Sequence, residues 1–303
     1  MSKPFKPLLI VIAGPTAVGK TRVAIELAKY FQTDIISADS RQVYREMRIG
    51  TAVPSKEELM EVKHHCIQHV SIHDEYNVGE YEKEVMGILS NIFMQKNVAI
   101  LCGGTGLYID AICNGLDEFP PIDARIKEEV ALICASKDKA WSLLQSLDPD
   151  YFNQVDRENM RRVSRALEVC LQTNKPFSSY LTKQKKERNF NVLKIYLQEE
   201  RTKLYKQIDQ RVDAMIQGGL MEECRTLFPF MHLKSLQTVG YSELFDHFNG
   251  LTSLEFAIDK IKQHSRNYAK RQMTWFNKDD SYIKFHPSKL DEMKECINKR
   301  LHD

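Results

Sequence analysis

A glycine, lysine and threonine pattern near the start of the chain is the feature best suited to chemistry. It reads G-x-x-x-x-G-K-T, and its members are Gly14, Pro15, Thr16, Ala17, Val18, Gly19, Lys20 and Thr21. In a P-loop of this kind the glycines let backbone N–H groups face a phosphate, and the lysine adds a positive charge. A threonine hydroxyl at the last position suits an Mg²⁺ ion that bridges phosphate oxygens. We therefore expect residues 14–21 to bind a phosphate or diphosphate together with Mg²⁺.

The strands and the helix predicted around this pattern indicate a parallel sheet. The apolar run at residues 8–13 predicts a buried strand, and apolar residues at helical spacing from Val23 predict a helix after it. Residues 34–38 and 98–102 read as two more short strands. They end in Asp39 and in the glycine-rich turn that carries Thr105. Because ligands of open α/β sheets bind at the carboxyl ends of the strands, Asp39 and Thr105 should lie near the P-loop.

The middle of the chain has a different composition. After Pro120-Pro121, residues 122–186 show helical spacing and no strand pattern, and a strand pattern returns at residues 192–197. We therefore predict an α/β fold, a P-loop NTPase-like parallel sheet core flanked by helices, with an inserted all-helical lobe. The expected domains are residues 1–120 and 188–303 for the core, and residues 121–187 for the lobe.

Two stripes of basic residues are the candidate surface for a charged partner. Arg157, Arg161 and Arg165 recur every fourth residue in the lobe. Lys262, Arg266 and Lys270 share a face of a later helix, with Tyr268, Arg271 and Trp275 close by. Basic side chains interleaved with aromatic ones suit a looped or single-stranded nucleic acid. An ordinary solvated face explains each stripe equally well.

Overall composition excludes few functions. The 303 residues include 43 basic and 41 acidic ones, a formal charge of +2, so total charge points to no partner. No apolar run is long enough to cross a bilayer, and the seven cysteines are scattered without a C-x-x-C pair. We expect a cytoplasmic protein with reduced thiols, no membrane partner and a monomeric state.

Taken together, several blocks of sequence resemble the bacterial tRNA dimethylallyltransferases. The resemblance runs in order over most of the chain. The blocks are residues 14–21, residues 37–44 (SADSRQVY), residues 49–52 (IGTA), residues 103–108 (GGTGLY), residues 165–169 (RALEV) and residues 269–276 (AKRQMTWF). Each block alone is weakly specific, whereas six in order are highly specific.

The resemblance implies a reaction and its substrates. A dimethylallyl group would pass from dimethylallyl diphosphate to the exocyclic amine (N6) of the adenosine adjacent to the anticodon (position 37), in tRNAs that read codons beginning with U. Diphosphate would be released. The P-loop would then hold the prenyl diphosphate rather than ATP, and the partner would be a tRNA anticodon stem-loop.

The resemblance also implies roles for individual residues. Lys20 and Arg211 would bind the diphosphate, Asp39 would take the amine proton, and Thr105 would orient the same amine or an adjacent phosphate. From the residues alone, a surface ion pair of Arg211 with Asp209 or Asp213 is the favoured explanation. The family positions that contact tRNA correspond to Asp39, Ser40, Arg41, Gln42, Thr105, Arg125, Met160, Arg161, Arg162, Val163 and Ser164.

Two other functions stay open at this stage. A small-molecule or nucleotide kinase would use the same P-loop and an acidic residue after the second strand. Against it stand the missing acidic residue after the strand at 98–102 and the lack of an arginine-rich lid. A nucleic-acid-binding NTPase without transfer chemistry would use the basic stripes but would leave Asp39 and Thr105 without a role.

Overall fold

The sheet at the centre of the molecule is built from six parallel strands. The structure is a computed structural model that describes residues 6–182 and 184–302. The strand order is β3-β2-β4-β1-β5-β6, and every neighbouring pair is parallel. The strands are β1 (Leu8–Ala13), β2 (Ile35–Ala38), β3 (His64–His65), β4 (Val98–Gly103), β5 (Asn191–Leu197) and β6 (Ile283–Phe285).

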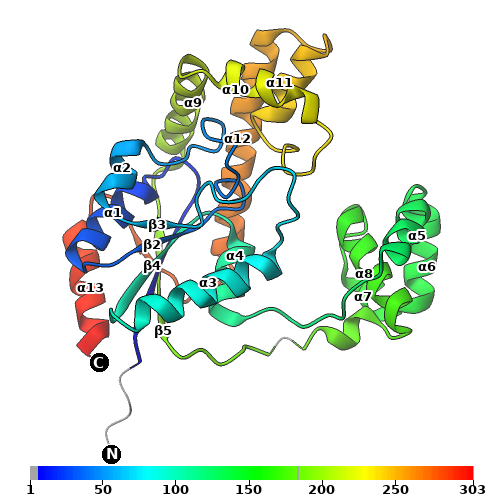
Figure 1. Ribbon diagram of the computed structural model, residues 1–303, viewed down its shortest axis with the longest axis horizontal. Helices are drawn as coiled ribbons and strands as arrows, with labels where there is room; N and C mark the ends of the chain where they lie inside the picture. Colours follow the sequence, from blue (N-terminus) through cyan, green and yellow to red (C-terminus); the bar gives the residue numbers. More distant parts are fainter. Residues whose placement is uncertain (1–5, 183, 303) are drawn as a thin grey trace, which may run out of the picture. The chain divides into compact units, whose positions relative to one another are not determined.

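Helices cover both faces of this sheet (Figure 1). Alternate residues of β1 point to opposite faces, and all six are buried, which is why this strand reads as one continuous apolar run. One face packs against α1 (Lys20–Tyr30) and α13 (Leu290–His302). The other face packs against α3 (Val78–Phe93) and α4 (Gly106–Asn114). A further helix, α2 (Lys56–Glu61), begins at a capping box formed by Ser55 and Glu58.

A second apolar core lies among the helices that follow β5. Its helices are α9 (Arg201–Gln217), α10 (Leu220–Leu227), α11 (Tyr241–Phe248) and α12 (Leu254–Phe276), with a short 3-10 turn η2 (Phe228–Phe230). The buried residues of this core also include three from the loop after β2, namely Val43, Tyr44 and Met47. The helix α12 spans 23 residues and contributes to this core and to both faces of the sheet. It is therefore the element that links the helical layer to the P-loop.

The inserted segment forms a compact unit of its own. Residues 114–186 make up this unit, and residues 1–113 and 187–303 make up the other. Its helices are α5 (Ala124–Cys134), α6 (Lys137–Leu147), α7 (Pro149–Gln154) and α8 (Met160–Thr173), followed by the 3-10 turn η1 (Phe177–Tyr180). They enclose a separate apolar core that includes Leu144, Val163 and Leu167. We call residues 114–186 the helical unit and the remainder the core unit.

The predicted fold class is confirmed, with differences in detail. The helical unit starts at Asn114 rather than 121, since the backbone N–H of Lys186 donates to the carbonyl of Asn114 (2.8 Å) and ties the two connecting segments together. The helices of this unit end before residue 181, short of the helical stretch expected up to 186. The short edge strands β3 and β6 were not expected from the sequence.

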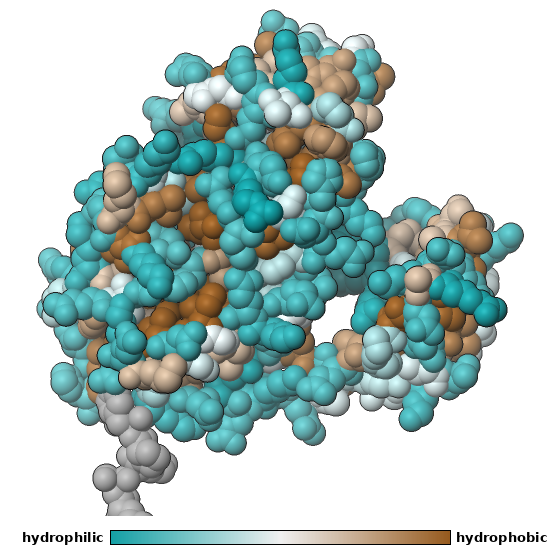
Figure 2. Space-filling model, viewed as in Figure 1, coloured by the Kyte–Doolittle hydropathy of each residue, from teal (hydrophilic) through white to brown (hydrophobic). Residues whose placement is uncertain are grey.

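Figure 2 shows a face on which hydrophilic residues predominate and hydrophobic areas are scattered. Within the described residues, no helix is both long and apolar enough to span a membrane. A site must therefore be sought in the cavities of the core unit.

Candidate active site

Two cavities lie at the carboxyl ends of β1, β2 and β4. The first, of about 370 Å³, is lined by residues of the P-loop, the segment after β2, α9 and α12. The second, of about 290 Å³, lies over the P-loop lysine. Thr16, Asp39, Arg211 and Tyr268 line both cavities. The chain thus brings the predicted diphosphate-binding residues and Asp39 to one place, as the sheet topology requires.

The P-loop is folded as its sequence pattern predicts. Gly19 stands just before α1 with φ of 96°, a conformation that favours glycine. The Nζ atom of Lys20 donates to the carbonyls of Gly14 (3.0 Å) and Pro15 (2.7 Å). Burial lowers the pKa of Lys20 to about 8, and the neighbouring Arg211 also lowers it. A phosphate that replaces the two carbonyls would therefore meet a desolvated cation.

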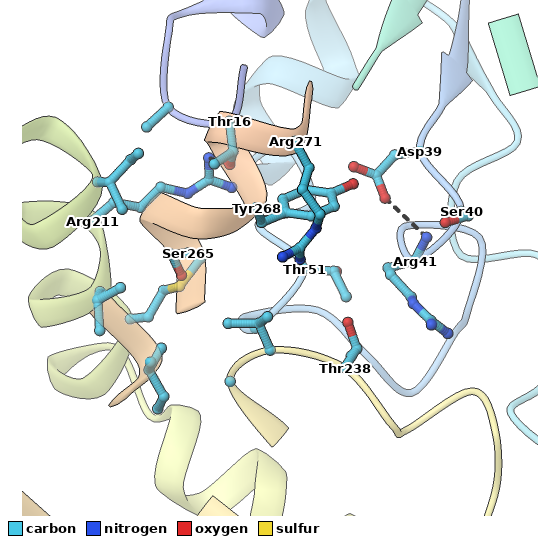
Figure 3. Close-up of a pocket in the computed structure, with 18 of the residues that line it drawn as sticks. Thr16, Asp39, Ser40, Arg41, Thr51, Arg211, Thr238, Ser265, Tyr268 and Arg271 are labelled. Carbon is cyan, nitrogen blue, oxygen red and sulfur yellow. Dashed lines mark hydrogen bonds between the residues drawn. The ribbon is translucent and has the colours of Figure 1, made fainter. Parts of the chain in front are cut away.

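Arg211 reaches this loop from α9. Its Nη1 donates to the Thr16 hydroxyl (3.2 Å), and burial lowers the pKa of its guanidinium while Asp39 opposes the shift. Figure 3 shows Arg211 and Thr16 side by side at one end of the first cavity. Two cations, Lys20 and Arg211, thus converge on one P-loop with few anions beside them. That arrangement suits a ligand with several negative charges.

The surface ion pair considered for Arg211 does not form. Asp213 binds Lys262 instead (2.6 Å), and Asp209 binds Arg266. Lys262 and Arg266 both belong to the basic stripe on α12. Two of the three cations in that stripe are therefore engaged with α9, and the stripe is less available to a nucleic acid than the sequence predicted.

Asp39 lies at the other end of the first cavity, and Thr105, which lines neither cavity, contacts Ser40 in the cavity wall. One carboxylate oxygen of Asp39 (Oδ1) accepts from the backbone N–H groups of Arg41 (2.9 Å) and Gln42 (3.3 Å). This contact caps the turn after β2 and is drawn as a dashed line in Figure 3 for Arg41. The Thr105 hydroxyl accepts from the Ser40 N–H (3.0 Å), and Tyr268 hydrogen-bonds with the Thr105 side chain. The turn is thereby fixed with the carboxylate of Asp39 beside the cavity.

Sequence reasoning missed the role of Gln272. Its buried amide accepts from the Thr16 N–H (2.8 Å) and donates to the Gly104 carbonyl (2.9 Å), so it joins the P-loop to the turn after β4. A Cβ on Gly104 would lie 2.1 Å from the Gln272 amide nitrogen. Tyr268 and Arg271 also line the first cavity from α12. The block at residues 269–276 marked the region, but only the fold brings it to the P-loop.

The candidate tRNA-binding residues divide into two groups. Ser40 and Arg41 line the first cavity, while the Gln42 amide is tied to Ser37 and to the carbonyls of Thr51 (3.2 Å) and Ala52 (3.0 Å). Gln42 lines the second cavity instead, and its amide fixes the loop at residues 51–52.

The second group lies in the helical unit. Arg125 on α5 and Arg161 and Arg162 on α8 are exposed, and Met160 and Ser164 are partly buried. Val163 is fully buried in the apolar core of this unit, which corrects the expectation of a side-chain contact with tRNA there. Arg165 is engaged, since it pairs with Glu168 (3.3 Å) and lies over the Phe119 ring.

Oxygen donors suited to a magnesium ion line the second cavity. They are the Thr21 hydroxyl at the first turn of α1 and the carboxylates of Asp39 and Glu58. Mg²⁺ prefers oxygen ligands and usually keeps several of its waters, so this donor set fits the ion.

Comparison with known proteins agrees with this geometry. The sequence model of the IPP transferase family matches residues 42–279. The chain belongs to the IPP transferase family. The tRNA dimethylallyltransferase of Christiangramia forsetii is 50% identical over 273 residues, which cover 89% of this chain and 90% of the relative. The tRNA dimethylallyltransferase 2 of Azobacteroides pseudotrichonymphae is 47% identical, with 95% of each chain covered.

Solved structures of this family share the fold. The tRNA isopentenylpyrophosphate transferase of Bacillus halodurans has a TM-score of 0.74 and 33% identity, with 98% of this chain and 97% of that one covered. A eukaryotic dimethylallyltransferase acting on tRNA has a TM-score of 0.82 and 26% identity, with 97% of this chain and 77% of that one covered. These matches favour the transferase prediction over the kinase alternative.

Proposed function

We propose that the protein transfers a dimethylallyl group from dimethylallyl diphosphate to the N6 amine of the adenosine adjacent to the anticodon of tRNA. The observation that carries this proposal is the shared cavity. Arg211 lies at one end of the first cavity and the Asp39 carboxylate at the other, and both also line the second cavity together with Lys20. Membership of the IPP transferase family and the names of its relatives support the choice of substrates.

The diphosphate would bind across the P-loop N–H groups, Lys20 and Arg211. In the transfer step the bond between C1 of the prenyl group and its diphosphate oxygen breaks, and a bond from N6 to C1 forms. Fixed cations stabilise the negative charge that develops on the leaving diphosphate. Mg²⁺, held through Thr21, would neutralise part of the same charge when bound.

The acceptor amine would lie beside Asp39. An exocyclic amine is a weak nucleophile, and a carboxylate that takes its proton as N6 attacks gives general-base assistance. The Oδ1 atom of Asp39 is occupied by the turn, so the second oxygen is the one proposed to accept the proton. Thr105, fixed by Ser40, would orient the amine.

The anticodon stem-loop is proposed to bind two surfaces. The target adenosine must leave its stack to enter the cavity, which is the usual requirement for chemistry on a base. Ser40 and Arg41 would meet the nucleotide at the cavity, and the exposed Arg125, Arg161 and Arg162 of the helical unit would contact phosphates. A monomeric state and a cytoplasmic location stay predictions.

The proposal is tested by identifying the product. The protein is incubated with unmodified tRNA, dimethylallyl diphosphate and Mg²⁺, and the tRNA is digested to nucleosides for mass spectrometry. We expect N6-dimethylallyladenosine, at one residue per tRNA and only when all three are present. A product formed on another base, or none, would contradict the proposal.

A further inference from the structure

One carboxylate on α10 holds a loop that lies far from it in the sequence. The Oε2 atom of Glu223 accepts from the N–H groups of Arg48 (3.0 Å) and Ile49 (2.8 Å), and its Oε1 atom accepts from that of Gly50 (3.1 Å). Three successive backbone donors thus converge on one side chain. Among the described residues no Lys, Arg or His forms an ion pair with Glu223.

A phenol completes this cluster. The Tyr241 hydroxyl donates to Oε1 of Glu223 (2.6 Å), and burial, with the Glu223 charge, raises the pKa of Tyr241, which keeps its proton in place. A Cβ on Gly50 would lie 2.6 Å from the Tyr241 ring, so only glycine fits beneath it. Glu223, Tyr241 and the loop at residues 48–50 form one fitted unit, which we call the Glu223 clamp.

The clamp joins two walls of the first cavity. Gly50 and Thr51 line it from one segment, and residues 237–240, directly before Tyr241, line it from another. Figure 3 shows Thr51 and Thr238 on the side of Asp39 and Arg41, away from Arg211 and Thr16. The clamp therefore acts on the end of the cavity that we assign to the acceptor nucleotide.

We propose that Glu223 is a positioning residue for the tRNA substrate: through its backbone contacts and Tyr241 it sets the distance between the two walls that receive the target nucleotide. This inference rests on the proposed function. A carboxylate is required because its oxygens only accept, whereas the amide of a glutamine would turn one NH₂ group toward backbone donors. Among the described residues, the hydrogen bonds of Lys20 and Arg211 go to the P-loop and not to the clamp, so the diphosphate end should be unaffected.

The test compares Glu223→Gln with Glu222→Gln, an exposed neighbour on the same helix. Steady-state kinetics are measured with each substrate varied, together with hydrogen exchange of the backbone amides at residues 48–50. We expect Glu223→Gln to raise the KM for tRNA, or to lower kcat, by roughly tenfold or more. The KM for dimethylallyl diphosphate should stay within about twofold. Exchange at residues 48–50 should become faster, and Glu222→Gln should match the wild type.

Other outcomes overturn the inference. Unchanged exchange at residues 48–50 would show that the clamp does not hold the loop. An equal rise in both KM values would show a general structural role, and no change in either KM or in kcat would show that the clamp does not position the tRNA. If Glu223→Gln fails to fold, Tyr241→Phe, which removes only the hydroxyl, must produce the same selective change in a smaller amount. A wild-type protein that transfers no prenyl group would instead contradict the proposed function, and the exchange data would still report on the clamp.

Discussion

The cavity of the core unit and the face of α8 in the helical unit both carry cations, but in different states. Lys20 and Arg211 are partly buried, and each has a fixed partner in the P-loop. Arg161 and Arg162 are exposed on α8. A buried cation is costly unless a partner compensates it, so its presence at a cavity indicates an anionic ligand. An exposed cation costs little, and its position alone indicates nothing.

The comparison therefore assigns the transfer reaction to the cavity of the core unit and tRNA binding to α8 of the helical unit. Substitutions in the cavity should act on the reaction and on the prenyl diphosphate. Substitutions on α8 should act on tRNA affinity alone. Four predictions, ordered from the largest expected effect to the smallest, test whether the cavity and α8 have these separate roles.

Replacing Asp39 should have the largest effect. Asp39→Asn retains an oxygen that can accept the N–H groups of Arg41 and Gln42, so the turn survives while the base is lost. We expect single-turnover transfer to fall by about 10²- to 10⁴-fold. Binding of inorganic diphosphate in the absence of Mg²⁺ should be nearly unchanged. A variant that kept the wild-type transfer rate would remove Asp39 from the chemistry.

Arg211→Ala should weaken binding of the prenyl diphosphate. Loss of a buried hydrogen bond to a charged group costs about 1.5–3 kcal/mol, which corresponds to a rise of roughly ten- to a hundredfold in KM for that substrate. Arg266→Ala is the matched control, because Arg266 of α12 pairs with Asp209 of α9, the helix that carries Arg211. Such pairs contribute little. If both variants had the same KM for the prenyl diphosphate, the distinction between a cation that lines the cavity and one that does not would fail.

Raising the pH above about 8 should deprotonate Lys20. Its pKa is lowered from 10.5 to about 8, chiefly by burial, so kcat/KM for the prenyl diphosphate should fall above about pH 8. Between pH 8 and 10.5 the unfolded chain holds more protons at this position than the folded one. The contribution of Lys20 to the free energy of unfolding therefore rises with pH across that window. Lys20→Arg should remove the alkaline fall in kcat/KM, and a persisting fall would assign it to another group.

Charge reversal on α8 should have the smallest effect on the reaction. The double variant Arg161→Glu, Arg162→Glu should weaken tRNA binding and reduce the slope of log affinity against log salt by about 0.7 to 0.9 for each lost phosphate contact. The free energy of unfolding should change by only about half a kcal/mol, since both residues are exposed. Lys127→Glu with Lys139→Glu, on α5 and α6, is the control. An equal change in the control would make α8 an ordinary solvated face.

Local sequence patterns were sufficient for the core strands and for the P-loop. Their apolar runs and glycine spacing depend on neighbouring residues, and the structure has β1, β2, β4 and β5 where they were expected. The two-residue β3 and the exposed β6 lack such a pattern, because tertiary pairing defines them.

The contacts that complete the site depend on residues distant in sequence. Gln272 meets Thr16 across 256 positions, and Glu223 meets Gly50 across 173. No local pattern reports such contacts. For Arg211, the resemblance to a family indicated the diphosphate, whereas local charge favoured an ion pair with Asp209 or Asp213. Only the structure shows that other cations on α12 take those partners.

The most direct measurement asks which substrate the P-loop of this protein uses. Wild-type protein, Mg²⁺ and unmodified tRNA are mixed with dimethylallyl diphosphate labelled in the prenyl group or with γ-labelled ATP, and label in the tRNA is counted after a single turnover. We predict that the prenyl label alone enters the tRNA, that ATP is not required, and that Lys20→Ala abolishes most of the transfer. Transfer of the γ-phosphate label, or prenyl transfer unaffected by Lys20→Ala, would contradict the account.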